Sequence, residues 1–327
     1  MQYIEIDATK FLACILIVIL HGIEPGGGLQ QIIYLMGSYG IPLFLVINGW
    51  LLADRNVNFK YANKKASKYI KFIGVWILLI GGLLSLVQRK LVFIDILVDI
   101  IKGQGILFHL WFLLGVCVIY YLMAFIENIN KTFLLNLCKS QFLILYISII
   151  FTAIFVINLV IKMIYGFEIR DYIAPCFRIV TNGGYFLIGI SLHNMKYKIN
   201  KRNLGIICLT SMILLCILSK MFNILWASSM YSSIPVIYGT IAIFLLIMDK
   251  PLKIYARLKN IISSSVGVWI LHPFILRIIN KIYRISFGDI IPISSKIFIT
   301  ILTIVIAIIL TLCIKKNRYL KYLIMEY

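Results

Sequence analysis

Lys10 and His21 stand at opposite ends of one apolar stretch, and they are the residues of this chain best suited to chemistry. Ten apolar residues, Phe11 to Leu20, separate them without interruption. At about 100° per residue, such a spacing returns to nearly the same face of an α-helix, roughly 16 Å along its axis. Asp7 and Cys14 fall on that face too. One membrane helix would therefore carry a carboxylate, an ammonium, a thiol and an imidazole in a single stripe.

Ionisable groups inside a membrane segment are costly, so they mark a functional site by default. We therefore expect the stripe to face the protein interior or a water-filled cavity. In the alternative interpretation, Lys10 and Asp7 reach one membrane surface along their apolar stems and His21 marks the other. If His21 is functional, general-base catalysis suits it, since the reference pKa of histidine is about 6.5.

The composition predicts an all-α, polytopic integral membrane protein. The chain has 327 residues, of which 62% are hydrophobic and 13% charged, whereas soluble domains are nearer half apolar and a quarter charged. In a soluble protein, a net charge of +20 would indicate a nucleic-acid binding partner. Here we expect the basic residues to orient loops, with no nucleic-acid partner. We expect a single transmembrane domain over residues 1–327 with no appended soluble domain.

Common cofactor motifs are not found in the sequence. It has no GxSxG elbow, Walker-type loop or GxGxxG segment opening a helix, and no cluster with metal-ligand spacing. The seven cysteines are scattered without a CxxC pair, so we interpret them as small buried hydrophobes. We therefore expect no metal and no permanently bound cofactor.

The apolar stretches predict about ten transmembrane helices with short connections. The second and sixth contain Gly, Pro or Asn, which are tolerated where neighbours or water satisfy freed backbone groups. The expected spans are residues 5–23, 38–53, 68–87, 106–126, 141–162, 177–193, 203–222, 230–249, 262–282 and 295–314.

Basic residues alternate from connection to connection, which predicts that both termini are cytoplasmic. His21 then lies toward the outside and Lys10 toward the cytoplasm. Five basic residues depart from the pattern: Arg89, Lys90, Lys102, Arg170 and Arg178. The clusters that follow it are Arg55, Lys60, Lys64, Lys65, Lys68 and Lys71; Lys196, Lys198, Lys201 and Arg202; Lys250, Lys253, Arg257 and Lys259; and Lys315, Lys316, Arg318 and Lys321.

Two further segments have both a structural and a functional interpretation. In GSYGIPLFLVINGWLL, residues 37–52, Asn48 either hydrogen-bonds to another helix or lines a cavity opposite His21. In the basic run at residues 60–71, Lys64, Lys68 and Lys71 share a helix face. The run either orients spans and binds anionic lipid, or binds phosphate at the cytoplasmic mouth.

The remaining histidines carry weaker signals. HLWFL, residues 109–113, places Trp111 where a span begins, and Trp is ordinary at a membrane interface. We interpret His272, beside Pro273, as a structural cap, and His193 as facing solvent.

The order of these segments resembles the acyltransferase family 3 membrane proteins, which move acyl groups onto extracytoplasmic sugars. Lys10 and His21 are similar to the family's basic residue and histidine, ten residues apart on the first helix, with Lys where Arg is common. GIPLFLVINGWLL is similar to its second-helix signature, with Asn48 where Ser is expected. Lys68 and Lys71 look like its Arg-x-x-Arg pair. LWFL at 110–113 and SSSVGVWILHPFI at 263–275 resemble later landmarks.

The resemblance implies O-acylation, most often O-acetylation, of a hydroxyl on an envelope polysaccharide or lipid-linked glycan, with cytoplasmic acyl-CoA as donor. His21 would be the general base. Lys10, Lys68 and Lys71 would hold the CoA phosphates, Asp7 would orient or neutralise Lys10, and Asn48 or Trp111 would line the acceptor side. The resemblance places the protein in a bacterial cytoplasmic membrane, among membrane lipids. The alternatives are a transporter or flippase of a lipid-linked or anionic glycan, and a structural partner in an envelope assembly.

The charge pattern yields a test of orientation. We expect the connection at 24–36 to be extracytoplasmic and that at 54–67 cytoplasmic. In a background without native cysteines, a cysteine at position 30 should react with an impermeant thiol reagent added outside the cell. Strong labelling of position 30 only from the cytoplasmic side would reverse the orientation.

Overall fold

The computed structural model describes residues 4–129, 142–194, 200–249 and 258–325, and every regular element among them is helical. Seven helical stretches of the described chain are long and apolar enough to cross a membrane, which confirms a polytopic, all-α membrane protein. The number of ten crossings and the side of the termini stay predictions. Part of the charge pattern, at Lys196, Lys198, Lys250, Lys253 and Arg257, lies outside the described residues.

Each of the ten expected apolar stretches holds a helix. The bounds are α1 Ile4–Gly22, α3 Gly40–Leu52, α4 Phe59–Gln88, α6 Trp111–Ile129, α8 Leu143–Tyr165, α9 Ile179–Asn194, α10 Lys201–Met221, α11 Ile234–Met248, α14 Ser265–Phe287 and α15 Ile293–Lys316. The shorter elements are α2 Leu29–Met36, α5 Phe93–Lys102, α13 Lys259–Ile262, η1 Gly37–Tyr39, η2 Phe108–Leu110, η3 Ile169–Asp171, η4 Pro175–Phe177, η5 Ala227–Met230 and η6 Leu320–Ile324.

Three elements differ from the sequence-based expectation. Helix α4 begins at Phe59 rather than near residue 68, because the Asn58 side chain accepts a hydrogen bond from the backbone N–H of Tyr61 at 2.9 Å and caps the helix. The basic run is therefore helical. Helix α2 occupies much of the expected 24–36 connection and continues through η1 into α3. Helix α5 fills a stretch for which no helix was expected.

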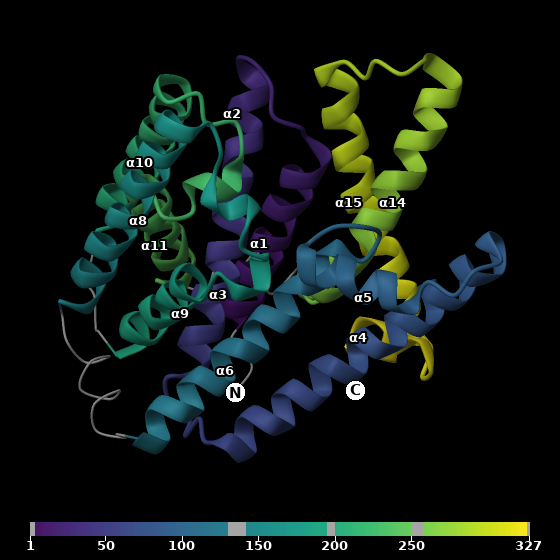
Figure 1. Ribbon diagram of the computed structural model, residues 1–327, viewed down its shortest axis with the longest axis horizontal. Coiled ribbons are helices and arrows are strands. Elements are labelled where there is room, and N and C mark those ends of the chain that lie inside the picture. The colour runs from purple at the N-terminus through teal and green to yellow at the C-terminus, as the bar shows by residue number, and fades with distance from the viewer. Residues whose placement is uncertain (1–3, 130–141, 195–199, 250–257, 326–327) are drawn as a thin grey trace.

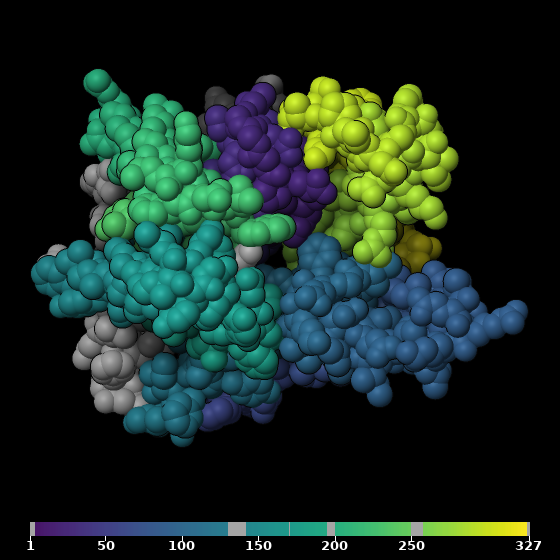
Figure 2. Space-filling view, turned by 45° about the horizontal axis from the view of Figure 1, so that its top comes forward, coloured from purple at the N-terminus to yellow at the C-terminus, as the bar shows by residue number. Residues whose placement is uncertain are grey.

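Helices α1 and α3 form the centre of the molecule (Figure 1). Helices α8 to α11 lie on one side, the α14–α15 hairpin lies on the other, and α4, α5 and α6 cross below. Figure 2 shows the same division on the surface, with the purple N-terminal segment between the green and yellow groups. Helix α1 begins and α15 ends toward the same side of the bundle.

Glycines let the α3 backbone approach both of its main neighbours. A Cβ at Gly40 would lie 3.1 Å from the carbonyl oxygen of Ala13 in α1. On the opposite contact, a Cβ at Gly49 would overlap the carbonyl oxygen of Phe186 in α9. A Cβ at Gly189 of α9 would in turn overlap that of Val46. Small residues at such crossings are how membrane helices pack without a hydrophobic driving force.

This reciprocal contact predicts that Gly189→Ala destabilises the protein. The added methyl would meet backbone, which cannot rotate away, so we expect a loss of about 1–3 kcal/mol of stability. Gly183→Ala is the matched control on the same helix, because a Cβ there meets nothing within 4 Å. Thermal unfolding in detergent should show a lower Tm for Gly189→Ala and an unchanged or higher Tm for Gly183→Ala. Equal Tm values for the two variants would contradict the packing.

Candidate active site

Helix α1 directs its ionisable stripe into the protein. Lys10 Nζ lies 3.1 Å from Asp7 Oδ1, one turn before it. Cys14 is fully buried, and its Sγ donates to the Ser265 carbonyl oxygen at 2.9 Å. His21, in the last turn, is exposed to a cavity. The stripe therefore runs along the interior side of α1.

His21 lines the largest of the cavities near this helix. We call it the His21 cavity, and its volume is about 1140 Å³, which exceeds the roughly 300–1,000 Å³ typical of small-molecule sites. Trp111, at the start of α6, lines the same cavity. Glu24 at its edge is paired with Lys296, whose Nζ lies 2.9 Å from Glu24 Oε2. The remaining polar wall includes Lys102, Gln104, Asp171, Arg178 and Ser228.

Lys10 lines a second cavity of about 360 Å³, which we call the Lys10 cavity. Arg55, Lys65 and Lys68 line it as well, and no carboxylate is among its described lining residues. Four cations in one recess create a positive potential that favours an anionic ligand. The charge pattern assigns Arg55 only to membrane orientation, and it places Lys65 in the basic run at residues 60–71, which has a phosphate-binding alternative. Nothing local in the sequence indicates that the two residues share a recess with Lys10.

Asn48 lies in the Lys10 cavity and not in the His21 cavity. Its Nδ2 donates to the Phe44 carbonyl oxygen of its own helix at 2.8 Å. Asn48 and Trp111 therefore line different cavities. The Tyr69 and Tyr120 rings, stacked with centroids 6.3 Å apart, form an aromatic wall near Asn48.

Lys68 and Lys71, the basic pair, line different sets of cavities. Lys68 lines the Lys10 cavity and also an adjoining cavity of about 690 Å³. Lys71 lines only the adjoining one, with Lys64. The structure thus brings Lys10 and Lys68 into one recess and places Lys71 next to it.

A wall of rings separates the two main cavities. On the Lys10 side are Phe44, Phe112 and Trp269. Phe112 lies 5.8 Å from Phe44 and 6.1 Å from Trp269 between ring centroids. Ile41, one turn from Phe44 on α3, and Trp111, next to Phe112 on α6, already face the His21 cavity. The same helices therefore line both cavities, back to back.

Two histidines that the sequence analysis left outside the site complete this wall. The His272 ring is stacked on His21, with centroids 5.5 Å apart and planes 16° apart. His109 lies 6.0 Å from His272 and 5.3 Å from Trp269. His272 is fully buried and α14 continues through Pro273, so the interpretation of His272 as a helix cap is wrong.

Several ring nitrogens in this wall lack partners. His272 Nδ1 donates to the Val268 carbonyl oxygen at 3.2 Å, which leaves its Nε2 as an acceptor. This Nε2 and both nitrogens of His109 are buried and have no hydrogen-bond partner among the described residues. Buried unsatisfied polar atoms cost stability, and such atoms in native proteins call for an explanation such as a ligand or a catalytic role.

The described residues hold no group of three or more His, Cys, Asp or Glu arranged to bind a metal ion. The fourth histidine, His193, lies apart from the cluster, with Nε2 3.2 Å from Asp54 Oδ2 and a side chain that is 21% exposed. It is thus only partly solvent-facing.

A comparison with protein-family models shows that a model described as an acyltransferase domain matches residues 3–312. The match runs from α1 into α15 and therefore includes every lining residue of the His21 cavity and all of the Lys10 cavity's lining except Met325. No curated protein and no solved structure matches the chain.

The Lys10 cavity predicts how lysine variants change the binding of coenzyme A. Lys68→Ala should weaken binding by about tenfold or more, because a hydrogen bond to a charged group contributes about 1.5–3 kcal/mol. Lys68→Arg should preserve or improve binding, since Arg contacts phosphate through two donors. Lys60→Ala, on the same helix but outside these cavities, is the control. Isothermal titration of the purified protein measures all three.

The double variant Lys68→Ala, Lys71→Ala tests whether the basic pair binds coenzyme A at all. An unchanged affinity for coenzyme A in this variant would mean that the basic run only orients the helices.

Proposed function

The chain belongs to acyltransferase family 3, and on this premise we propose that it moves an acyl group, most often acetyl, from acyl-CoA to a hydroxyl of an envelope or lipid-linked glycan. The protein is a membrane acyltransferase. The acetyl-CoA donor, the glycan acceptor and the bacterial cytoplasmic membrane are part of the proposal. No permanently bound cofactor, metal or nucleic acid takes part in it.

One observation carries the proposal. A single helix, α1, presents Lys10 to a cation-lined cavity and His21 to a larger cavity, and aromatic rings lie between the two. Roughly 16 Å of helix separates the two residues. The donor's phosphates and the acceptor's hydroxyl can therefore be held by different cavities, with the extended pantetheine arm reaching toward His21.

The residues have the chemistry that the reaction needs. An alcohol is a poor nucleophile, so His21 takes the hydroxyl proton as the oxygen attacks the thioester carbonyl. A tetrahedral intermediate forms and its carbon–sulfur bond breaks. The new ester leaves with the acceptor, and the imidazolium of His21 returns the proton to the thiolate, which yields free coenzyme A.

The two buried histidines, His109 and His272, supply roles in the transfer step for which the sequence alone named no residue. The stacked His272 ring fixes the plane of His21. The unpaired nitrogens of His109 lie in the wall that the thioester must reach. In its neutral form His109 carries one N–H, and we propose that this group donates to the developing oxyanion, because preorganised donors in a dry site stabilise such charge.

The other residues hold the substrates. Lys10, Lys68 and Lys71 contact the donor's phosphates, with Arg55 as an additional forked donor in the Lys10 cavity. Asp7 pairs with Lys10 until the donor arrives. Trp111 provides an aromatic face for a sugar ring in the His21 cavity, whereas the position of Asn48 favours the donor side.

The decisive test is His21→Gln. Gln keeps a polar side chain but cannot titrate, so transfer of label from acyl-CoA in membranes should fall by about 10²–10⁴-fold. His193→Gln is the matched control, because His193 lies outside the ring cluster. It should keep near-normal turnover per inserted protein.

Near-normal turnover by His21→Gln would remove His21 as the base. In another outcome, the native protein transfers no label and instead moves an unmodified glycan across the membrane. That result would replace the proposal with the alternative function of a transporter or flippase. Mass spectrometry of envelope glycans from cells with and without the protein identifies the acceptor.

A further inference from the structure

The second half of α14 carries a row of cations, Arg277, Lys281 and Arg284, which we call the α14 cation stripe. Their i, i+4, i+7 spacing places them on one helix face, and all three side chains are exposed. Figure 1 shows the last turns of α14 at the edge of the molecule, away from α8 to α11. The proposed transfer reaction does not use these residues. We propose that the α14 cation stripe binds the headgroup phosphate of an anionic phospholipid.

The packing of α14 fixes the direction of the stripe. Ile275 and Ile279, two residues before and after Arg277, point about 160° away from it at 100° per residue. Both pack against the hydrophobic core. His272, which is stacked on His21, is buried on the same side of the helix. The stripe therefore faces the surroundings of the protein and not the His21 cavity, whose described lining contains no residue of α14.

Two contacts on either side of Arg277 fix the antiparallel register of α14 and α15. A Cβ at Gly267 would overlap the side chain of Thr311. Nearer the end of α14, Tyr283 Oη donates to Ser295 Oγ at 3.1 Å. The same number of residues separates these contacts on each helix, so the register is regular between them. Each residue of the stripe can therefore be matched to its level on α15.

The register places the stripe at one boundary of the hydrocarbon layer. Residues 297–314 of α15 carry no charge. They are about 27 Å long at 1.5 Å per residue, close to the roughly 30 Å of a bilayer's hydrocarbon core. Arg277 is level with residue 301, about 6 Å inside the end of this run, and Arg284 is level with residue 294, about 5 Å beyond it. The stripe therefore crosses from the hydrocarbon into the layer where lipid phosphates lie.

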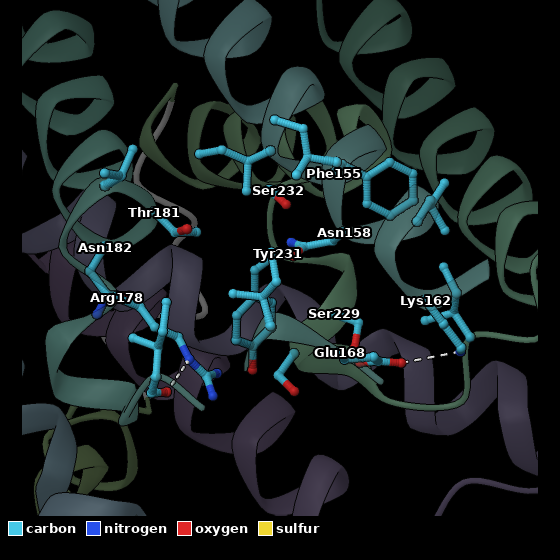
Figure 3. A pocket seen from close by; sticks show the side chains of 18 of the residues that line it. Phe155, Asn158, Lys162, Glu168, Arg178, Thr181, Asn182, Ser229, Tyr231 and Ser232 are labelled. Atoms are coloured by element: carbon cyan, nitrogen blue, oxygen red, sulfur yellow. Dashed lines mark hydrogen bonds and ion pairs between the residues drawn. The ribbon is translucent and has the colours of Figure 1, made fainter. Parts of the chain in front are cut away.

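The three cations have no anionic partner in the part of the chain that the structure describes. Two cations on other helices do have one. Lys296 Nζ lies 2.9 Å from Glu24 Oε2. Lys162 and Glu168, 3.1 Å apart, line the pocket shown in Figure 3. Because an ionisable group that faces hydrocarbon without a partner is costly, Arg277 requires an anion from outside the protein.

A phospholipid matches both the stripe and the surface beside it. Each cation is followed by an exposed isoleucine, and these residues, Ile278, Ile282 and Ile285, are 58%, 58% and 77% exposed. They form an apolar ridge along which an acyl chain can lie, while an arginine contacts the phosphate through two hydrogen bonds. A protein partner would have to bring carboxylates to this depth, whereas lipid phosphates are already there. A zwitterionic headgroup adds a positive charge near the stripe, so we expect an anionic lipid to bind more strongly.

The test uses photoreactive phosphatidylglycerol, with a diazirine in its acyl chain, in nanodiscs that contain the full-length protein. Photoreactive phosphatidylcholine with the same chains is the reference probe. On the native protein, residues 278–287 should label at least about tenfold more strongly with phosphatidylglycerol, because a hydrogen bond to a charged group strengthens binding by about that factor. Equal labelling by the two probes would overturn the proposal, and this comparison requires no variant.

A triple variant tests the stripe itself. Arg277→Gln, Lys281→Gln and Arg284→Gln together should bring the ratio of the two labellings close to one without lowering Tm, since the three side chains are exposed. Lys220→Gln is the control, because Lys220 is an exposed cation in the last turn of α10, and it should keep the native ratio.

A native ratio in the triple variant would overturn the proposal, and so would loss of the ratio in Lys220→Gln. Crosslinking of residues 278–287 to a second copy of the chain instead of to lipid would show that protein covers this face, and would overturn it as well. None of these measurements requires acyl transfer, so their outcome is independent of the His21 experiment.

Discussion

The close approach of α3 to α1 and α9 is the constraint on which the rest of the structure depends. Gly40 brings α3 against the Ala13 carbonyl, and Gly49 and Gly189 bring it against α9. Because backbones this close cannot slide independently, α3 holds α1 in place. Helix α1 in turn carries both Lys10 and His21. Glycines therefore help to set the positions of these two candidate site residues.

This arrangement also explains how ionisable groups are tolerated inside the molecule. Lys10 is paired with Asp7 and opens to a recess, and His21 opens to a larger one. Neither has to face hydrocarbon, which would be costly. The buried nitrogens of His109 and His272 that have no hydrogen-bond partner among the described residues still lower the stability of the protein. Their cost is understandable if substrate atoms complete their hydrogen bonds during the reaction.

Sequence reasoning was effective where the signal is local and limited where it is not. The Lys10–His21 stripe follows from helical periodicity, and the ten helices follow from apolar runs. The stacking of His272 on His21 joins residues from the two ends of the chain, and no local pattern predicts it. The same holds for Arg55 beside Lys10. The start of α4 at Phe59 was missed although Asn58 offered a cap signal, because the expected span was bounded by the apolar stretch from residue 68.

In the proposed reaction, lysines at positions 10, 68 and 71 would contact the donor phosphates. Lys is a strongly hydrated point charge on a flexible stem and does not form the two-pronged contact of Arg. The Lys10 cavity compensates through number, since it gathers three lysines around Arg55. Such a recess attracts an anion through its summed potential, while the one guanidinium supplies directional contacts. If the proposed donor binds there, its affinity should depend on the whole recess rather than on any single cation.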